Sequence, residues 1–394
     1  MPEVDLPFSR DEYALRLAKT RAAMSARGLD VLLVTDPSNM AWLTGYDGWS
    51  FYVHQGVLVS LEHDPIWWGR FQDANGALRT VYMGDDHVIG YPDHLVQSAI
   101  DHPMEHLAQQ IADRGWDTGA IGVEMENYYF TGKALDVLRH DLPNATIKDA
   151  TALVNWCRAV KSATEIGYMR RAAAIVEHMM DTAIALIEPG RRKNEVVAEI
   201  FKAGIVGTPE FGGDYAAIVP LLPTGVDASA PHLTWNDMPF IEGAGTFFEI
   251  AGCYRRYHCP LCRTVYLGRP PQEILDAEKA LVDGLSAGLE AARAGNRACD
   301  VANALHDELR KAGIEREARC GYPIGISYPP DWGERTISFR GSDETVLEPG
   351  MTFHFMPGLW MTDWGLEITE SILIRETGPA ECLTSYERRL FVKE

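Results

Sequence analysis

Residues 249–265 read Glu-Ile-Ala-Gly-Cys-Tyr-Arg-Arg-Tyr-His-Cys-Pro-Leu-Cys-Arg-Thr-Val, and this stretch decides the fold. Glu249 follows Thr-Phe-Phe and precedes Ile-Ala-Gly, so it lies in an apolar run. A carboxylate in such surroundings costs free energy unless it has a partner. We therefore interpret Glu249 as a functional residue, against the alternative of an exposed glutamate on a strand.

The same stretch contains Cys259-Pro-Leu-Cys262, a spacing that zinc sites and thiol-exchange motifs use. The sequence has no second pair of cysteines at this spacing, and His258 is the only adjacent donor. The segment also has the pattern of a strand. We therefore interpret the two cysteines as strand residues rather than as a zinc or redox site.

Length and charge limit the class of protein. The chain has 394 residues, too many for one ordinary core, so two domains are expected. The formal net charge of −20 argues against binding to nucleic acid or to anionic membranes, because both need a basic surface. A net charge of this size is compatible with a protein from a saline habitat, and equally with an ordinary acidic enzyme of bacterial type.

The remaining composition indicates a cytoplasmic protein. No run of about 18 apolar residues appears, so no membrane span is expected. The first residues, Met-Pro-Glu-Val-Asp, lack the basic and apolar regions of a signal peptide. The seven cysteines are scattered and odd in number, which favours a reducing compartment over a disulfide framework.

Strands and helices alternate up to about residue 150, which is an α/β pattern. The pattern predicts helices over 10–27 and 131–142 and strands over 31–35 and 120–124.

A linker falls near residues 160–162, so we predict domains over 1–160 and 161–394. Ser162 and Glu165 have capping-box spacing at the start of a helix that ends before Pro189. A second helical run covers residues 271–294.

Arg263-Thr264, with Gly252 before it, resembles the metal-binding segment of the pita-bread (M24) superfamily of methionine aminopeptidase, aminopeptidase P and prolidase. In that superfamily two Asp, three further ligands and a dinuclear metal centre form the site. The corresponding positions here hold Glu249, Pro260, Tyr322, Met356 and Thr369. A dinuclear site needs converging carboxylate and imidazole donors, so we expect neither metal nor cofactor.

The resemblance implies an α/β N-terminal domain of creatinase type and an α+β pita-bread catalytic domain. The segment Asn39-Met-Ala-Trp-Leu-Thr-Gly-Tyr46 resembles the start of many creatinase-type N-terminal domains. Lys161-Ser-Ala-Thr-Glu-Ile166 resembles the first helix of the pita-bread domain.

Creatinase is a member of the superfamily that works without metal, and Pro231-His232 resembles its catalytic histidine segment. Cys262 replaces the glutamate that binds guanidinium in creatinase, which argues against creatine as substrate. The whole pattern, including residues 44–54 and Tyr-Pro-Pro-Asp-Trp-Gly at 328–333, is most similar to the ectoine hydrolases, creatinase-like enzymes of compatible-solute catabolism.

This resemblance implies that the enzyme opens the cyclic amidine ring of ectoine to N-acetyl-2,4-diaminobutyrate. Glu249 is expected to act as general base or nucleophile, and His232 as acid/base. Glu367 and Glu370 flank the last ligand position, and a regular strand points only one of them into the site. We favour Glu367 as catalytic and keep Glu370 as a substrate-binding candidate.

The other substrate-binding candidates are Trp49, Phe51, Tyr52, Cys262, Tyr322, Arg335 and Trp360. The rings at 49–52 are expected to cover the site of a neighbouring chain in a homodimer, with core packing as the alternative. Arg335, with Arg340, is expected to hold the substrate carboxylate. Hydroxyectoine as a second substrate and a complex with a downstream deacetylase are further expectations.

Three alternatives stay open from the sequence. The first is another creatinase-type amidinohydrolase of a small cationic solute. The second is a divergent, metal-dependent prolidase. The third is a pita-bread module that binds without catalysis.

Overall fold

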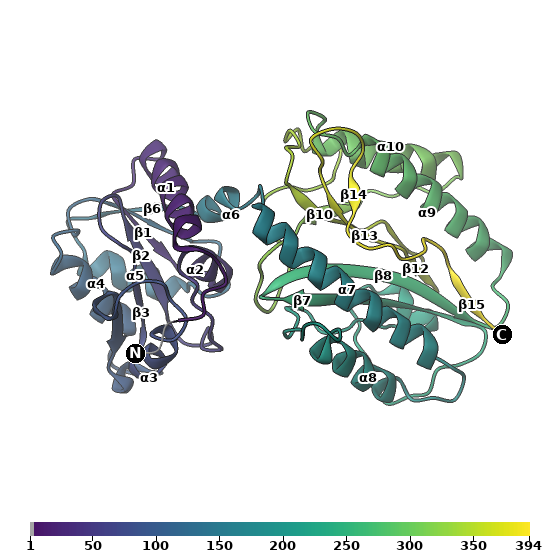
Figure 1. The fold of residues 1–394 in the computed structure, drawn as a ribbon, viewed down its shortest axis with the longest axis horizontal. Helices are drawn as coiled ribbons and strands as arrows, with labels where there is room; N and C mark the ends of the chain where they lie inside the picture. Colours follow the sequence, from purple (N-terminus) through teal and green to yellow (C-terminus); the bar gives the residue numbers. More distant parts are fainter. Residues whose placement is uncertain (1–3) are drawn as a thin grey trace. The chain divides into compact units, whose positions relative to one another are not determined.

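The computed structural model describes residues 4–394, which separate into one compact unit up to Arg158 and a second over Ala159–Glu394 (Figure 1). The division predicted from the sequence, between 160 and 161, lies two residues further along the chain. Each unit has its own sheets and its own buried core.

The first unit is an α/β domain built on one six-stranded sheet in the order β4-β3-β2-β1-β5-β6. Its strands are β1 (Val31–Val34), β2 (Gly56–Ser60), β3 (Ile66–Arg70), β4 (Val88–Tyr91), β5 (Ala120–Val123) and β6 (Thr146–Asp149). Its α-helices are α1 (Arg10–Ala26), α2 (Pro37–Thr44), α3 (Phe71–Ala77), α4 (Pro103–Ala112), α5 (Gly132–Asp141) and α6 (Leu153–Cys157). The structure confirms the helices predicted over 10–27 and 131–142 and both predicted strands.

The Asn39 segment has a structural role in this unit. Asp36 caps α2 by accepting a hydrogen bond from the backbone N–H of Ser38. The buried carboxylate of Glu124 accepts hydrogen bonds from the backbone N–H of Thr35 at 2.7 Å and from the amide of Asn39 at 2.6 Å. These contacts fasten the β1–α2 turn to the end of β5.

The second unit has four α-helices and three sheets among its described elements. The helices are α7 (Ala163–Leu186), α8 (Lys193–Val206), α9 (Gln272–Ala291) and α10 (Ala298–Lys311), with a 3-10 helix η3 (Gly225–Ser229). The strands are β7 (Ala244–Tyr254), β8 (Tyr257–Leu267), β9 (Gly321–Pro323), β10 (Thr352–Phe355), β11 (Gly358–Trp360), β12 (Gly365–Glu367), β13 (Glu370–Leu373), β14 (Glu381–Cys382) and β15 (Phe391–Lys393). The sheets run β14-β13-β10-β9, β11-β12 and β15-β8-β7.

The predicted first helix of this unit is confirmed, and its cap explains where it begins. Ser162 accepts a hydrogen bond from the backbone N–H of Glu165, and the Glu165 carboxylate accepts one from the backbone N–H of Ser162. The reciprocal pair satisfies two backbone donors that the first turn of a helix leaves free.

The hairpin of β7 and β8 is the centre of the second unit, and α7 lies along it (Figure 1). A Cβ atom on Gly252 would lie 2.0 Å from the carbonyl oxygen of Ala172 in α7. Only glycine permits this close approach of helix and strand. This explains the glycine that follows the Glu249 position.

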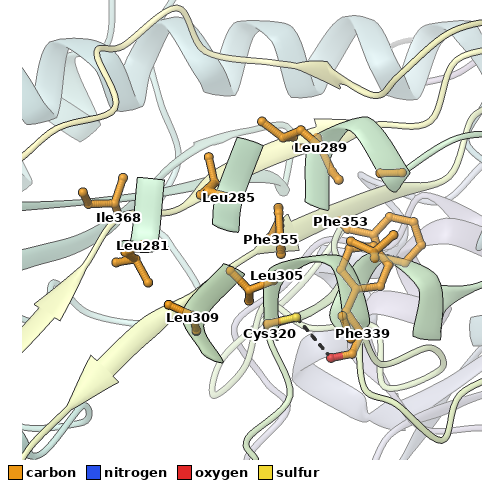
Figure 2. Close-up of a cluster of buried hydrophobic side chains, with 14 of the residues drawn as sticks. Leu281, Leu285, Leu289, Leu305, Leu309, Cys320, Phe339, Phe353, Phe355 and Ile368 are labelled. Carbon is orange, nitrogen blue, oxygen red and sulfur yellow. Dashed lines mark hydrogen bonds between the residues drawn. The ribbon is translucent and has the colours of Figure 1, made fainter. Parts of the chain in front are cut away.

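A second hydrophobic core supports the other side of the unit. Leu281, Leu285 and Leu289 of α9 and Leu305 of α10 pack with Phe353 and Phe355 of β10 (Figure 2). Because side chains alternate across a strand, His354 between the two phenylalanines points away from this core. The core thereby fixes the face of β10 that His354 occupies.

The cysteine pair of β8 is divided between two faces of that strand. Cys259 lies in the cluster that packs against α7, whereas Cys262 contacts Phe247 and Ala228. The two thiols thus cannot serve one zinc or redox site. None of the helices in the described part of the chain combines the length and apolar character that a membrane crossing requires.

Candidate active site

Glu249 lies near the middle of β7 with its side chain in the interior. Only 6% of the residue is exposed, and its backbone N–H and C=O both pair with Leu221 at 3.0 Å. Across the hairpin it stands opposite Cys262 of β8. The position of Glu249 is therefore fixed by backbone pairing on both sides.

Glu367 ends β12 and is fully buried. The Thr264 hydroxyl makes two hydrogen bonds to the backbone of Glu367. It donates to the Glu367 carbonyl and accepts from the Glu367 N–H, each at 2.9 Å. Neither carboxylate oxygen of Glu367 has a hydrogen-bond partner within residues 4–394. A buried carboxyl group without a partner is costly, which indicates a functional group rather than a structural one.

Glu249 and Glu367 form a buried carboxyl pair. Burial raises the pKa of Glu249 well above its usual value, and the neighbouring Glu367 raises this pKa further. Burial raises the pKa of Glu367 to about 7, against the opposing effects of the Cys262 thiol and the Arg316 guanidinium. Two like charges cannot both ionise cheaply in such a place, so near neutral pH the pair holds one proton.

Cys262 lies beside this pair as a neutral thiol. Burial, followed by the charges of Glu367 and Glu249, raises the pKa of Cys262 well above its usual value. The thiol is near enough to affect the pKa of Glu367, but it is not in hydrogen-bonding geometry with either oxygen of Glu367. This environment suppresses the thiolate, so Cys262 lacks the form needed for a nucleophile.

Glu370, the other candidate near the last ligand position, faces a different partner. Its carboxylate accepts a hydrogen bond from Arg263 at 2.7 Å in a fully buried ion pair. Arg263 also donates to the carbonyl oxygens of Thr369 and Cys262. The Arg263-Thr264 motif thus fastens β8 to the segment containing Glu367 and Glu370, a role that requires no metal ligand.

A buried chain of hydrogen bonds continues from this region. Tyr322 Oη lies 3.0 Å from His354 Nδ1, and His354 Nε2 lies 2.8 Å from Thr369 Oγ1. Trp332 Nε1 donates to Tyr322 Oη at 2.8 Å. Burial lowers the pKa of His354 to about 3, and Arg319 adds to the effect, so the imidazole is neutral. Sequence reasoning missed His354, although a histidine between two core phenylalanines of a strand is a visible signal.

A group of basic and aromatic side chains lies beside these residues. The guanidinium of Arg319 lies 4.8 Å from the ring centroid of Tyr322, and Arg319 is exposed. Arg316 donates to the carbonyl oxygens of Gly358 and Arg319, and it lies 5.7 Å from the ring of Trp360. Trp360 packs against the Cys262 cluster, and its buried Nε1 has no partner in the described residues.

Two sequence-predicted residues are exposed. His232 lies in a turn after η3, and η3 packs on β7 and β12, the strands that contain Glu249 and Glu367. Arg335 is exposed and has a positive φ of 58°.

The aromatic candidates of the first unit are surface residues. Trp49 is 58% exposed and Tyr52 is 64% exposed. The ring of Trp49 lies 4.9 Å from that of Phe51, and Arg70 donates a hydrogen bond to the hydroxyl of Tyr52 at 3.2 Å. Trp49 and Tyr52 therefore each expose more than half of their surface.

The donor set does not fit a dinuclear metal centre. Among residues 4–394, no three His, Cys, Asp or Glu side chains are grouped so as to hold a metal ion. Tyr322 and His354 are occupied by each other and by Trp332 and Thr369. The carboxyl pair alone remains, which is too few ligands for two ions.

Comparison with known proteins agrees with this architecture. The model of metallopeptidase family M24 matches residues 167–376, and that of the creatinase/prolidase N-terminal domain matches residues 16–160. The chain is 62% identical to the ectoine hydrolase of Halomonas elongata over 400 residues, which cover 100% of both proteins. It is 42% identical to an uncharacterised hydrolase/peptidase of Sinorhizobium fredii over 99% of each chain.

Solved structures of low sequence identity show the same fold. The prolidase from Thermococcus sibiricus superposes with a TM-score of 0.84 at 18% identity, covering 97% of this chain and 99% of that one. The dipeptidase PepE from Mycobacterium ulcerans gives a TM-score of 0.81 at 23% identity, with coverages of 98% and 99%.

Proposed function

The chain belongs to metallopeptidase family M24, with that family's creatinase/prolidase type of N-terminal domain, and from this premise we propose that it hydrolyses ectoine without a metal ion. The product is N-acetyl-2,4-diaminobutyrate. The observation that carries the proposal is the buried pair of Glu249 and Glu367, together with the full-length identity to an ectoine hydrolase.

The chemistry of the pair suits a cyclic amidine. Protonated ectoine carries positive charge on its amidinium carbon, which is thereby electrophilic without a Lewis acid. Because Glu249 and Glu367 share one proton near neutral pH, the site offers an ionised carboxylate and a carboxylic acid together. These are the general base and general acid that hydrolysis needs.

In the proposed reaction, the ionised member of the carboxyl pair accepts a proton from a water molecule while the water oxygen bonds to the amidinium carbon. The carboxyl pair then gives a proton to a ring nitrogen, and the bond between that nitrogen and the carbon breaks. The hydroxyl proton of the tetrahedral intermediate passes to the departing amine, so that an amide and an ammonium group result and the pair returns to its starting protonation state. The alternative is direct attack of the Glu249 carboxylate on the amidinium carbon, from the same position in the site. Mass spectrometry of quenched enzyme distinguishes the two, because only direct attack leaves a substrate adduct on Glu249.

We propose that Arg319 binds the substrate carboxylate. Its guanidinium lies against the ring of Tyr322 and donates no hydrogen bond within residues 4–394. A guanidinium presents a fork of donors that matches a carboxylate. The Arg316 donors, in contrast, bind backbone carbonyls, so Arg316 shapes the loop that carries Arg319.

His232 completes the proposed site as an acid/base at its exposed edge, where it exchanges protons with solvent. We also propose a homodimer in which the exposed rings of Trp49 and Tyr52 cover ectoine bound to the partner chain. Light scattering tests the dimer. A cytoplasmic location and a complex with the deacetylase that consumes the product are parts of the same proposal.

The test is NMR of ectoine incubated with the protein and with Glu249→Gln. We expect the acetyl signal of N-acetyl-diaminobutyrate with the unchanged protein and none with Glu249→Gln. Glu348→Gln, which changes an exposed carboxylate, is the matched control and retains turnover. His232→Ala is expected to lose most activity. Near-normal turnover by Glu249→Gln would remove that residue from the mechanism.

A further inference from the structure

The side chains around His354 form a chain of hydrogen bonds in which each hydrogen can be assigned. Trp332 Nε1 donates to Tyr322 Oη at one end, and the backbone N–H of Cys262 donates to Thr369 Oγ1 at the other, each at 2.8 Å. Between them, two contacts join Tyr322 to His354 and His354 to Thr369. Each of these two contacts needs one hydrogen.

Three hydrogens are present for these two contacts. Tyr322 and Thr369 bring one hydroxyl hydrogen each, and the neutral imidazole of His354 brings one N–H. In one arrangement Tyr322 donates to Nδ1 and Nε2–H donates to Thr369, so the Thr369 hydrogen is left over. In the other, Thr369 donates to Nε2 and Nδ1–H donates to Tyr322, so the Tyr322 hydrogen is left over.

The hydrogen that is left over needs an acceptor, because buried donors are almost always paired. The two buried carboxylate oxygens of Glu367 accept no hydrogen bond within residues 4–394, so neither hydroxyl of the chain is bonded to them in this structure. Glu249 and Glu367 both lie near enough to raise the pKa of the Tyr322 hydroxyl, after the larger effect of burial. The Tyr322 end of the chain therefore lies within electrostatic range of the carboxyl pair.

We propose that His354 is a positioning residue that exchanges between its two neutral tautomers, so that Tyr322 and Thr369 act as the two ends of a proton relay in the site. The inference rests on the proposed hydrolysis for its role in turnover. It adds to the Glu249–Glu367 pair a second route by which a proton crosses the site.

The relay balances in hydrogens. Thr369 gives its free hydroxyl hydrogen to the reacting group and takes the hydrogen of His354 Nε2. His354 Nδ1 takes the hydroxyl hydrogen of Tyr322, and the Tyr322 oxygen takes a proton from the group that faces it. One proton has then moved across the site, and the chain stands in its other arrangement with no charge left on the imidazole.

The first test uses the free protein and needs no substrate. In a sample with ¹⁵N-labelled histidine, His354→Gln identifies the two ring-nitrogen signals of His354. Tyr322→Phe leaves Nδ1 without a partner and fixes the proton on Nε2, whereas Thr369→Val fixes it on Nδ1. We expect the unchanged protein to give shifts between these two references. Shifts equal to either reference would overturn the proposal, because one tautomer would then be fixed.

The second test measures turnover of ectoine by His354→Gln, whose side chain can still hydrogen-bond on both sides but cannot pass a proton. We expect kcat to fall by about 100-fold with KM nearly unchanged, a size typical of a lost proton transfer. A loss confined to KM, or no loss, would overturn the role in turnover. If the unchanged protein left ectoine intact, the proposed function would fail while the ¹⁵N result still decided the tautomer exchange.

Discussion

Replacing Glu367 by Gln should make the protein more stable at alkaline pH, because it removes a carboxyl group that resists ionisation where it is buried. The folded state raises the pKa of Glu367 from 4.5 to about 7. A group with a raised pKa holds its proton in the folded chain while the unfolded chain has released it. The stability that this proton contributes is present below about pH 4.5 and is lost as the pH rises through about 7.

The size of the effect follows from the shift. Each pKa unit corresponds to about 1.4 kcal/mol, so the unchanged protein loses about 3 kcal/mol of unfolding free energy across this range. Glu367→Gln carries no titrating group there. We expect the variant to match the unchanged protein at about pH 5 and to exceed it by up to about 3 kcal/mol at about pH 9.

Urea unfolding at both pH values measures this difference, with Glu348→Gln as the exposed control that shifts stability by less than about 0.5 kcal/mol. If the Glu367→Gln protein had the pH dependence of the unchanged protein, burial would not raise the pKa of Glu367 in the folded chain.

Two further predictions concern binding and packing. Arg319→Ala should raise KM for ectoine by about 10- to 100-fold with a smaller effect on kcat, because a charged hydrogen bond contributes about 1.5–3 kcal/mol. An unchanged KM would mean that another residue binds the substrate carboxylate. Gly252→Ala should destabilise the second unit by about 1–3 kcal/mol or more, because its Cβ would lie 2.0 Å from the Ala172 carbonyl oxygen. Urea unfolding of that variant checks the packing, and wild-type stability would contradict it.

Much of the fold could be predicted because its signals are local. The Ser162–Glu165 capping box and the apolar stripe after it mark α7, and the Arg263-Thr264 ending marks β8. The motif also identified Glu249, since an acidic residue in an apolar strand stands out without knowledge of its neighbours. These features require only a few consecutive residues.

The remainder of the site depends on contacts between distant strands. His354 gains its role from Tyr322 and Thr369, which lie 32 and 15 residues away. The separate directions of Glu367 and Glu370 depend on Arg263 and Thr264 of β8, more than 100 residues earlier. No local sequence pattern determines how these distant strands are aligned. Arg319 is one of several charged residues in its loop, and only its contact with Tyr322 in the folded chain distinguishes it.

The most direct test of the account is turnover of ectoine by protein freed of metal with a chelator, followed by NMR together with metal analysis of the same sample. We expect undiminished formation of N-acetyl-diaminobutyrate by metal-free protein, because the carboxyl pair of Glu249 and Glu367 supplies both base and acid. Loss of turnover that Mn²⁺ restores would contradict it, since the site would then bind metal through ligands other than those identified.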